Sequence, residues 1–268
     1  MGWGDELMVT GQARERQARD PRRVRVVYER PRWHPAWDHN PRIARLDETG
    51  DFQELVARDG YLRPYIARKE GDRWTWRAWG PPRGELYFTP DELDFGAQHA
   101  GHIIVEPNLK NGAPVAKQWG WVRWNKLAWL MNKRGIRLAQ LGDPTAPRLD
   151  RVEVIRTPTM RHAAAVLARA AAAVLPEGGL HHVAAAVGTP AVVIFGGYIA
   201  PAVTGYADQV NLFPPDARWP LGCGSRHRCE HCAAAMVSIA PEAVAKELEK
   251  LLERSSDEAG RRRLAARA

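Results

Sequence analysis

The sequence contains 268 residues, of which 45% are hydrophobic and 26% are charged, with a formal net charge of +8 and a pI of about 9.7. This composition is typical of a soluble globular protein, and no apolar run approaches the ~20 residues that cross a bilayer. The positive charge favours a polyanionic partner such as nucleic acid or an acidic membrane surface, the alternative being a generally cationic surface. Because residues 1–11 carry neither a basic leader nor an apolar signal core, we expect a cytosolic protein.

Residues 1–100 are expected to form a small N-terminal part without strong periodicity. A glycine loop at its start leads into a helical spacing of apolar residues that ends at Asp20. Residues 30–50 are rich in proline, tryptophan and asparagine and predict a loop. Short strand-like segments lie at 23–29, 60–67 and 84–90.

Residues 101–256 show a regular alternation of apolar strands and amphipathic helices. Strands are predicted at 102–108, 136–142, 152–157, 172–176 and 190–196. Helices are predicted at 121–135, 159–170, 180–188 and 240–256. This order predicts an α/β fold with a parallel, doubly wound sheet, with a boundary between the two parts near residues 98–102. Residues 257–268 are expected to be a flexible tail.

Eleven tryptophans are unusual for this length, and many of them stand among arginines. They concentrate in the segments 30–42, 72–83 and 117–130. Aromatic planes beside guanidinium groups suit stacking on nucleic-acid bases, and also on sugars. The alternative is that amphipathic tryptophans simply fill the core, which accounts for some of them.

A second feature is the run Glu177, Gly178, Gly179 between a predicted strand and a predicted helix. Ligands of open parallel sheets bind where strands end and helices begin. Glycines there permit close approach of a ligand to the backbone, and the free amides of the helix favour an anion. His181 and His182 fall in the first helical turn. These residues predict a diphosphate site, with Glu177 near sugar or ribose hydroxyls, and the alternative is an ordinary turn with two half-exposed histidines.

All three cysteines fall within ten residues of one another, so they are not a dispersed disulfide framework. Cys223, Cys229 and Cys232 together with His227 predict a structural zinc site, in which the CxxC pair supplies two thiolates. The fourth ligand is ambiguous because His231 also lies in this segment. A reduced cluster or a local disulfide are the alternatives, and Arg226 and Arg228 beside it are candidates to face a phosphate.

The order of these motifs resembles the C-terminal half of family 9 glycosyltransferases, the heptosyltransferase-like enzymes with the GT-B fold. Their acidic–small–Gly run, histidine, Ala-Ala, Gly-x-Pro turn and apolar strand ending in Phe-Gly are matched by residues 177–196. The family's Lys-x-Trp segment is approximated by KQWGWVRWNKL from Lys117, and its Gly-x-Gly-Asp loop by GWGDELMVTG from Gly2. The resemblance covers residues 102–252 and, locally, 2–12. Glu-Gly replaces the usual Asp-Thr or Asp-Ser, and the N-terminal part is shorter than the family's.

The resemblance implies two Rossmann-like halves with parallel sheets, the N-terminal one reduced, and a nucleotide-sugar, most simply a UDP-sugar, in residues 101–256. It implies an inverting reaction without a catalytic metal, in which Asp5 accepts the proton of the acceptor hydroxyl. The implied groups that hold the leaving diphosphate and the sugar are Lys117, Glu177, Gly178, Gly179, His181 and His182, with His182 matching the family histidine. Family members act on lipopolysaccharide cores.

For the acceptor we expect 5-hydroxymethylcytosine in double-stranded DNA, because the overall pattern also resembles the small glycosyltransferases found with phage oxygenases. The target base would leave the stack to reach Asp5, and phosphate contacts would make binding fall with salt. The expected acceptor contacts are Gly4, Arg30, Arg32, Trp33, Trp37, Arg42 and Arg45. The alternatives are a lipopolysaccharide-core acceptor and a non-catalytic protein that binds sugar-nucleotides or nucleic acid.

Overall fold

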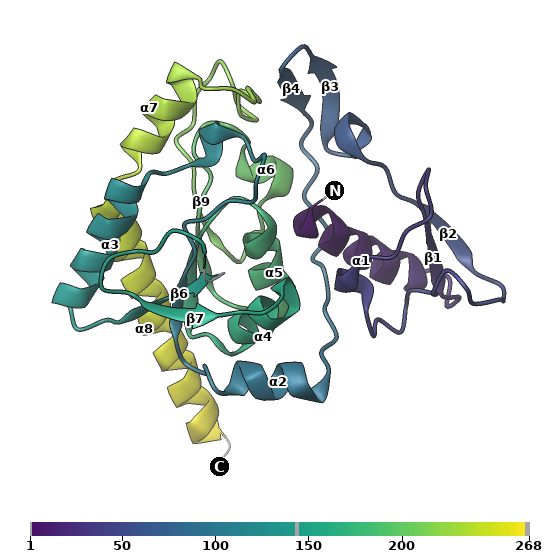
Figure 1. Cartoon of the computed structure of the whole chain (residues 1–268), viewed down its shortest axis with the longest axis horizontal. Coiled ribbons are helices and arrows are strands. Elements are labelled where there is room, and N and C mark those ends of the chain that lie inside the picture. Colours follow the sequence, from purple (N-terminus) through teal and green to yellow (C-terminus); the bar gives the residue numbers. More distant parts are fainter. Residues whose placement is uncertain (1, 143–144, 266–268) are drawn as a thin grey trace.

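A computed structural model describes residues 2–142 and 145–265, with residues 256–265 given as backbone. The chain forms a larger C-terminal part built on one sheet and a smaller N-terminal part beside it (Figure 1). Among the helices of the described residues, none is both long and apolar enough to cross a membrane. The predicted α/β class is confirmed.

The C-terminal part is organised around a six-stranded sheet in which every pair of neighbours is parallel. In spatial order its strands are β10 (Val210–Leu212), β9 (Ala191–Ile194), β8 (Ala172–Pro176), β5 (Ile103–Val105), β6 (Leu138–Gly142) and β7 (Glu153–Arg156). From β5 the chain first winds outward through β6 and β7, and then returns to place β8 on the other side of β5. This reversal between β5 and β8 makes the sheet doubly wound, as predicted.

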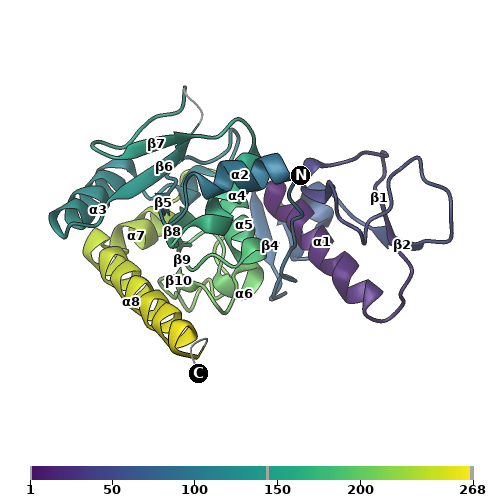
Figure 2. The same cartoon turned by 90° about the horizontal axis from the view of Figure 1, so that it is seen from below.

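Helices cover both faces of this sheet (Figure 2). One face carries α3 (Trp121–Lys133) and α8 (Pro241–Ala265), which pack on each other. The opposite face carries α4 (Met160–Arg169) and α5 (Gly179–Val187). Strand β8 shows why both faces are apolar: Ala173 and Leu175 belong to the core beneath α4 and α5, whereas Ala172 and Val174 belong to the core beneath α3 and α8. Successive side chains of a strand point to opposite faces, so a strand buried on both sides is apolar throughout.

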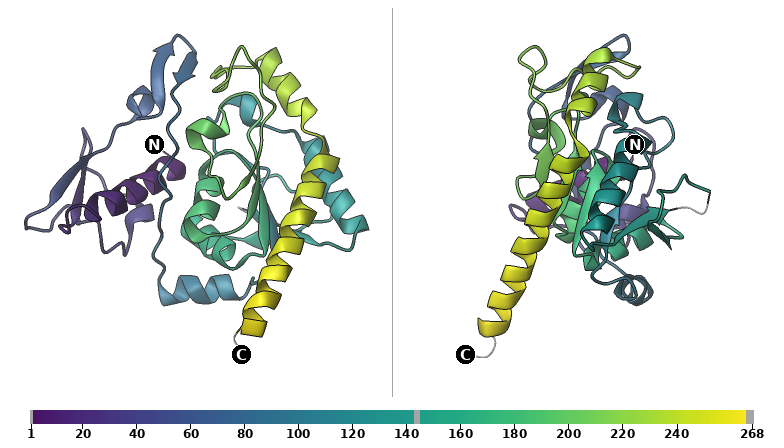
Figure 3. Two further views of the ribbon diagram at one scale, coloured as in Figure 1. Left: turned by 180° about the vertical axis from the view of Figure 1, so that it is seen from behind. Right: turned by 90° about the vertical axis from the view of Figure 1, so that its left-hand side faces the viewer.

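The N-terminal part begins with α1 (Trp3–Gln17), which packs against α5 of the other part. Its parallel sheet contains the two strands β1 (Val24–Val27) and β2 (Gln53–Val56), a strongly reduced version of the expected half. A separate antiparallel hairpin, β3 (Ile66–Glu70) with β4 (Arg73–Trp76), reaches across to the C-terminal part (Figure 3). The predicted helix, the strand at 23–29 and the loop at 30–50 are therefore confirmed.

The structure differs from the sequence-based predictions in three places. Segment 84–90 is extended but forms no strand, and it leads into the unpredicted helix α2 (Pro90–Ala97). A capping box starts α2, in which the Thr89 hydroxyl accepts from the amide of Glu92 and the Glu92 carboxylate accepts from the amide of Thr89. Because α2 packs on α4, the change from one part to the other comes before α2 and not at 98–102.

The C-terminal end also differs from the prediction. Helix α8 continues to Ala265, so most of the segment predicted as a flexible tail is helical, while residues 266–268 lie outside the described residues. The short elements α6 (Pro201–Thr204), β10 and α7 (Glu230–Ser238) were not predicted. Each is too short or too weakly periodic to be found from its apolar spacing.

Candidate functional site

A cavity of about 580 Å³ lies between the two parts, at the carboxyl ends of β5 and β8. These two strands flank the reversal of strand order, where open parallel sheets bind their ligands. Glu106 follows β5 and Glu177 follows β8, and both carboxyl groups line the cavity. The N-terminal part supplies the opposite wall through α1 and the β3–β4 hairpin.

The start of α5 forms one wall of this cavity. Gly178, Gly179 and Leu180 line it, as the Glu-Gly-Gly run predicts. Amides in the first turn of a helix have no intrahelical acceptor, so those of Gly179 and Leu180 offer donors to an anion. The Gly178 amide differs, because it donates to Nδ1 of His181 over 2.9 Å.

Glu177 and Lys117, both predicted to hold the donor, form a buried ion pair in the cavity wall. The Glu177 carboxylate also accepts a hydrogen bond from the Thr204 hydroxyl at 3.2 Å. Burial acts to raise the pKa of Glu177, but the Lys117 ammonium and nearby groups hold it below its usual value. The carboxylate is therefore ionised, and it keeps the lysine aimed at the cavity without a bound ligand.

His181 does not face a ligand, and its predicted role in binding the diphosphate is wrong. Its side chain is fully buried. Nδ1 accepts from the Gly178 amide, so Nε2 carries the proton and donates to the Thr204 carbonyl at 2.9 Å. Burial lowers its pKa, which keeps the ring neutral. With both ring nitrogens occupied, His181 fixes the turn and leaves no open metal position beside Glu177 and His182, although the three lie within 4.8 Å of one another.

His182 lies at the contact between α5 and α1 and lines the cavity. Its Nδ1 is 2.8 Å from the Tyr206 hydroxyl. Burial, followed by the neighbouring His181 and Lys117, lowers the pKa of His182 well below its usual value, so the ring is neutral. Gly4 packs directly on the ring: a Cβ at Gly4 would lie 2.3 Å from Cδ2 of His182. Gly4 is thus required for helix packing, a different role from the predicted acceptor contact.

Asp5 lies in the first turn of α1, and its carboxylate is held by three groups. The Gly2 amide and Arg63 Nη1 each donate to Oδ2 at 3.1 Å, and the Tyr65 hydroxyl donates to Oδ1 at 2.6 Å. Burial acts to raise the pKa of Asp5, but Arg63, Tyr65 and the Gly2 amide lower it below its usual value. The carboxylate is therefore ionised and fixed in orientation. Arg63 and Tyr65 were not predicted, because nothing in their local sequence marks them.

Asp5 lines a second cavity as well, of about 520 Å³, formed within the N-terminal part between α1 and β2. Its lining includes three exposed arginines, Arg16, Arg19 and Arg58, and one exposed carboxylate, Glu15, so the exposed charges have a net positive sign. Val56 and Leu62 at its edge are half exposed. The Asp5 carboxylate therefore lies in the wall between a cavity at the sheet reversal and a cavity with cationic and apolar sides.

In the tryptophan- and arginine-rich segment, most side chains predicted to contact the acceptor are buried or paired with other groups of the protein. Trp37 is 1% exposed and donates to the Glu6 carbonyl, so its predicted contact with an acceptor is wrong. Arg32 pairs with Glu6 and Asp59, and Arg42 with Glu85. The indole of Trp33 donates to Asp38, and Arg45 lies over its ring. Arg30 is exposed.

The β3–β4 hairpin joins a C-terminal loop at the edge of the first cavity. The Trp74 amide donates to the Gly224 carbonyl, and the Arg226 amide donates to the Asp72 carbonyl, each at 3.0 Å. The guanidinium groups of Arg63 and Arg226 lie 4.9 and 4.4 Å from the centre of the Trp74 ring. Arg226 lines the cavity, as its predicted role at a phosphate requires, whereas Arg228 is exposed and does not line it.

Glu106 at the end of β5 was not predicted as a site residue. Its carboxyl group is 6% exposed and accepts a hydrogen bond from the Asn108 amide at 2.8 Å. Burial raises its pKa to about 8. Near neutral pH the group is protonated, so it offers a hydrogen-bond donor to the cavity without adding negative charge.

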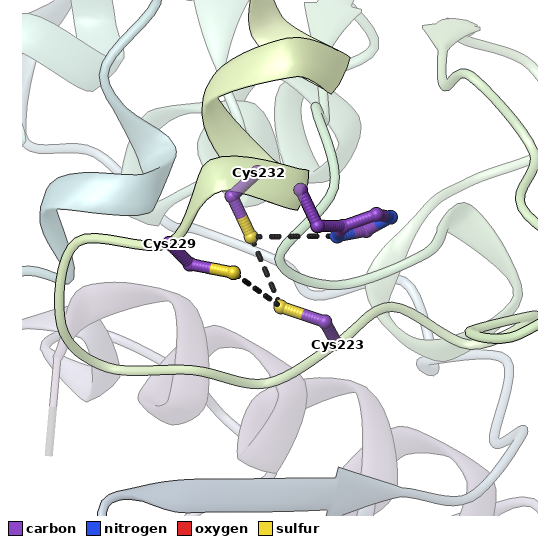
Figure 4. A group of neighbouring side chains, drawn as sticks. Cys223, Cys229 and Cys232 are labelled. Carbon is purple, nitrogen blue, oxygen red and sulfur yellow. Dashed lines mark hydrogen bonds between the residues drawn. The ribbon is translucent and has the colours of Figure 1, made fainter.

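The cysteine segment includes the C-terminal loop that meets the β3–β4 hairpin, since Gly224 and Arg226 lie between Cys223 and Cys229. Cys223, Cys229 and Cys232 are free thiols that gather around one point (Figure 4). His227 is exposed and pairs with Asp72, away from the thiols, so its prediction as the fourth zinc ligand is wrong. His231 lies beside the thiols instead, with a ring nitrogen within 4.8 Å of the three sulfurs.

Comparisons with known proteins agree with this arrangement. Residues 103–233 match the family model of "Glycosyltransferase family 9 (heptosyltransferase)", whereas no curated protein matches the sequence. A glycosyl transferase family 9 protein from Veillonella parvula has a TM-score of 0.63 at 13% identity, with 95% of each chain covered. The iron-containing dodecameric glycosyltransferase TibC from enterotoxigenic E. coli has a TM-score of 0.65 at 15% identity, with 95% of this chain and 74% of TibC covered.

E. coli heptosyltransferase WaaC, solved with ADP, has a TM-score of 0.53 at 14% identity, with 95% of this chain and 96% of WaaC covered. E. coli ADP-heptose heptosyltransferase II is matched over 65% of this chain and 54% of its own length, at 19% identity and a TM-score of 0.49. At these identities the TM-scores above 0.5 demonstrate a shared fold, and the GT-B-like architecture expected from the sequence is confirmed.

Proposed function

We propose that this chain, whose residues 103–233 match the family 9 glycosyltransferase model, moves a sugar from a nucleotide-sugar to a hydroxyl of an anionic acceptor, with inversion. The observation that carries the proposal is the position of Asp5. Its carboxylate is ionised and lies in the wall shared by two cavities. A general base for glycosyl transfer needs this placement, between the donor carbon and the acceptor hydroxyl.

In this proposal the donor diphosphate occupies the cavity at the sheet reversal. The amides of Gly179 and Leu180, the Lys117 ammonium and Arg226 line that cavity and offset the charge that grows on the leaving diphosphate. Glu106 donates a hydrogen bond in its protonated form. These groups supply the positive potential from the protein itself, so the reaction is proposed to proceed without a catalytic metal.

The acceptor hydroxyl approaches from the second cavity. It loses its proton to Asp5 as its oxygen attacks the anomeric carbon, while the bond from that carbon to the diphosphate breaks. Arg63 and Tyr65 hold the Asp5 carboxylate during this step and are positioning residues. Attack from the face opposite the leaving group inverts the anomeric centre.

We further propose a UDP- or ADP-linked donor. The residues predict a UDP-sugar only by family resemblance, whereas WaaC was solved with ADP. An ADP-sugar is therefore the first donor to test, followed by UDP-sugars.

The basic and apolar lining of the second cavity favours a phosphorylated, amphipathic glycan acceptor of the lipopolysaccharide-core type. Arg16, Arg19 and Arg58 provide cationic groups, and the half-exposed Val56 and Leu62 provide apolar ones. Hydroxymethylated DNA is less well supported, because Trp37 is a core residue and Arg32 and Arg42 are paired within the protein. Duplex DNA is therefore tested as the alternative acceptor.

The test combines a panel of ADP- and UDP-sugars with a phosphorylated lipid-core oligosaccharide and, separately, with duplex DNA containing 5-hydroxymethylcytosine. Mass spectrometry of the products is expected to find one added sugar on the glycan. Addition to DNA would overturn the glycan acceptor, and addition to neither, with donor binding intact, would overturn the enzymatic proposal in favour of a binding protein. Arg19→Ala with Arg58→Ala should raise the acceptor KM while leaving the donor Kd unchanged.

A further inference from the structure

A compact group of three thiols and one imidazole lies at the junction of a C-terminal loop and α7. The sulfurs of Cys223 and Cys232 are 3.0 Å apart, and those of Cys223 and Cys229 are 3.9 Å apart. Nδ1 of His231 is 3.9 Å from the Cys232 sulfur. Cys223 and Cys232 are buried, and Cys229 is partly buried. Figure 4 shows the three thiols converging from the loop and from the first turn of the helix.

The orientation of His231 is a second, independent observation. Its Nδ1 faces the thiols, whereas Nε2 lies 3.4 Å from a carboxylate oxygen of Asp216. Histidines that bind metals usually donate their other ring N–H to a carboxylate or carbonyl, which fixes the tautomer and leaves the ligating nitrogen free. His231 already has this arrangement, and its side chain is largely buried.

We propose that Cys223, Cys229, Cys232 and His231 bind one thiophilic divalent cation, Zn²⁺ or Fe²⁺, in a tetrahedral site. Three thiolates and one imidazole form a closed set of four ligands, which is typical of structural rather than catalytic sites. The thiols lose their protons on binding, and their charge compensates the cation.

The site lies where a cation would fasten the two parts of the molecule together. The Cys223 and Gly224 amides donate to the carbonyls of Gly197 and Tyr198, and Gly224 accepts from the amide of Trp74 in the β3–β4 hairpin. The backbone approach is close, since a Cβ at Gly224 would lie 1.7 Å from the Trp74 carbonyl oxygen. Fixing Cys223 therefore fixes the short segment that carries Arg226 to the cavity edge.

This consequence rests on the proposed function, since it assigns Arg226 to the donor diphosphate. The metal itself does not contact the donor. By holding the segment from Cys223 to Arg226, it keeps the arginine beside Trp74 and the hairpin closed over the cavity.

The metal proposal is tested on the full chain, purified under reducing conditions, by elemental analysis. We expect about one Zn²⁺ or Fe²⁺ per chain, and the loss of most of it in Cys229→Ser and Cys232→Ser. His227→Ala is the matched control and should retain the metal. Co²⁺ exchanged into the site should give a thiolate-to-cobalt charge-transfer band and the visible spectrum of a tetrahedral ion. Reduced protein without metal, a cobalt spectrum lacking the thiolate band, or a disulfide among the three cysteines would each overturn the proposal.

Asp216→Asn gives a finer test that leaves all four ligands in place. The loss of such a carboxylate partner typically weakens metal binding 10- to 100-fold, and we expect a change of about 10-fold in the apparent Zn²⁺ Kd. An unchanged Kd would remove His231 Nδ1 as a ligand oriented by Asp216.

Chelation tests the consequence for the donor. Binding of ADP to the metal-loaded and the chelated protein is compared by calorimetry, together with hydrogen exchange of the hairpin. We expect roughly 10-fold weaker ADP binding, which corresponds to the loss of about one hydrogen bond from Arg226 to the diphosphate, and faster exchange at Trp74 after chelation. Unchanged exchange and affinity would overturn the fastening role. If the protein binds no nucleotide at all, the proposed function fails, while the metal analysis still decides the site.

Discussion

The two helices that pack on each other at the edge of the donor cavity, α1 and α5, begin with the same hydrogen bond, but its acceptor has a different role in each. Each follows a glycine, and in each the side chain three residues later accepts from that glycine's amide: Asp5 from Gly2 and His181 from Gly178. In α5 the second ring nitrogen of His181 donates a hydrogen bond to the Thr204 carbonyl. In α1 the carboxylate also reaches Arg63 and Tyr65 and lines both cavities.

The difference comes from the distant neighbours of each capping residue and not from the helix start itself. A cap satisfies one exposed amide wherever it occurs. Whether the remaining atoms of the capping group face a ligand depends on what the rest of the chain places around them. Both ring nitrogens of His181 bond to residues of the C-terminal part, so its role is to stabilise the helix start. Asp5 lies at the contact between two parts, where cavities form.

Replacing Asp5 by asparagine should give the largest effect on activity. The amide keeps the size and can still accept from the Gly2 amide, but it cannot take a proton. We expect the rate of transfer to fall by roughly 10²- to 10⁴-fold, the usual contribution of a general base, with the donor Kd unchanged. Single-turnover kinetics and nucleotide binding measure the two quantities. Asp91→Asn, at an exposed aspartate, is the control, and near-normal turnover of Asp5→Asn would remove this carboxylate as the base.

At the start of α5, the Glu177 carboxylate lies within 4.8 Å of His181 and forms the buried ion pair with Lys117. Lys117→Gln leaves the Glu177 carboxylate buried without its countercharge, which typically costs about 3–5 kcal/mol of folding free energy. Urea denaturation measures this loss. Lys117→Gln combined with Glu177→Gln should recover a large part of it, because no unpaired charge then remains. A double variant no more stable than the single one would show that the ion pair is not the cause.

Glu106 provides a pH-dependent test. Its pKa in the folded protein is about 8, above the value near 4.5 for an exposed glutamate, because burial favours the neutral form. Its contribution to stability is therefore complete below about pH 4.5 and is lost as the pH rises through about 8. We expect the free energy of unfolding to fall by on the order of 1 kcal/mol per pH unit over the upper part of this range, and Glu106→Gln to flatten the slope. ADP binding should weaken as the pH rises through about 8, where the Glu106 carboxyl group of the folded protein ionises beside the diphosphate. Equal slopes in both proteins would place the pH dependence elsewhere.

The smallest expected effect concerns the contact between the two helices. Gly4→Ala places a Cβ against the His182 ring and should destabilise the fold by about 1–3 kcal/mol through overpacking. His182→Ala in the same chain should relieve the clash, so the two changes are expected to be less than additive. Full additivity in thermal unfolding would mean that Gly4 does not limit the approach of α1 to α5.

Much of the C-terminal part follows from local sequence. Segments such as 172–176 are short, apolar and bounded by turns, and Gly188 ends α5 in the left-handed conformation at φ 78°. Such patterns reflect the periodicity of strands and helices, so the parallel sheet and the position of Glu177, Gly178 and Gly179 at its edge could be predicted. In the N-terminal part, α1, the strand at 23–29 and the loop at 30–50 could be predicted, whereas a strand such as β2 could not. Only one of its four residues is buried, so it has no apolar pattern, and its pairing depends on neighbours far along the chain.

Local sequence is enough to predict the alternation of strands and helices, the glycine turns and the proximity of three cysteines, because these depend on residues close together in the chain. The packing of distant segments, by contrast, brings Arg63 and Tyr65 to Asp5, buries Trp37 and places His231 rather than His227 beside the thiols. Hydrogen bonds, burial and charge pairing act through space, and their energies depend on which groups the packing of the two parts brings within a few ångströms.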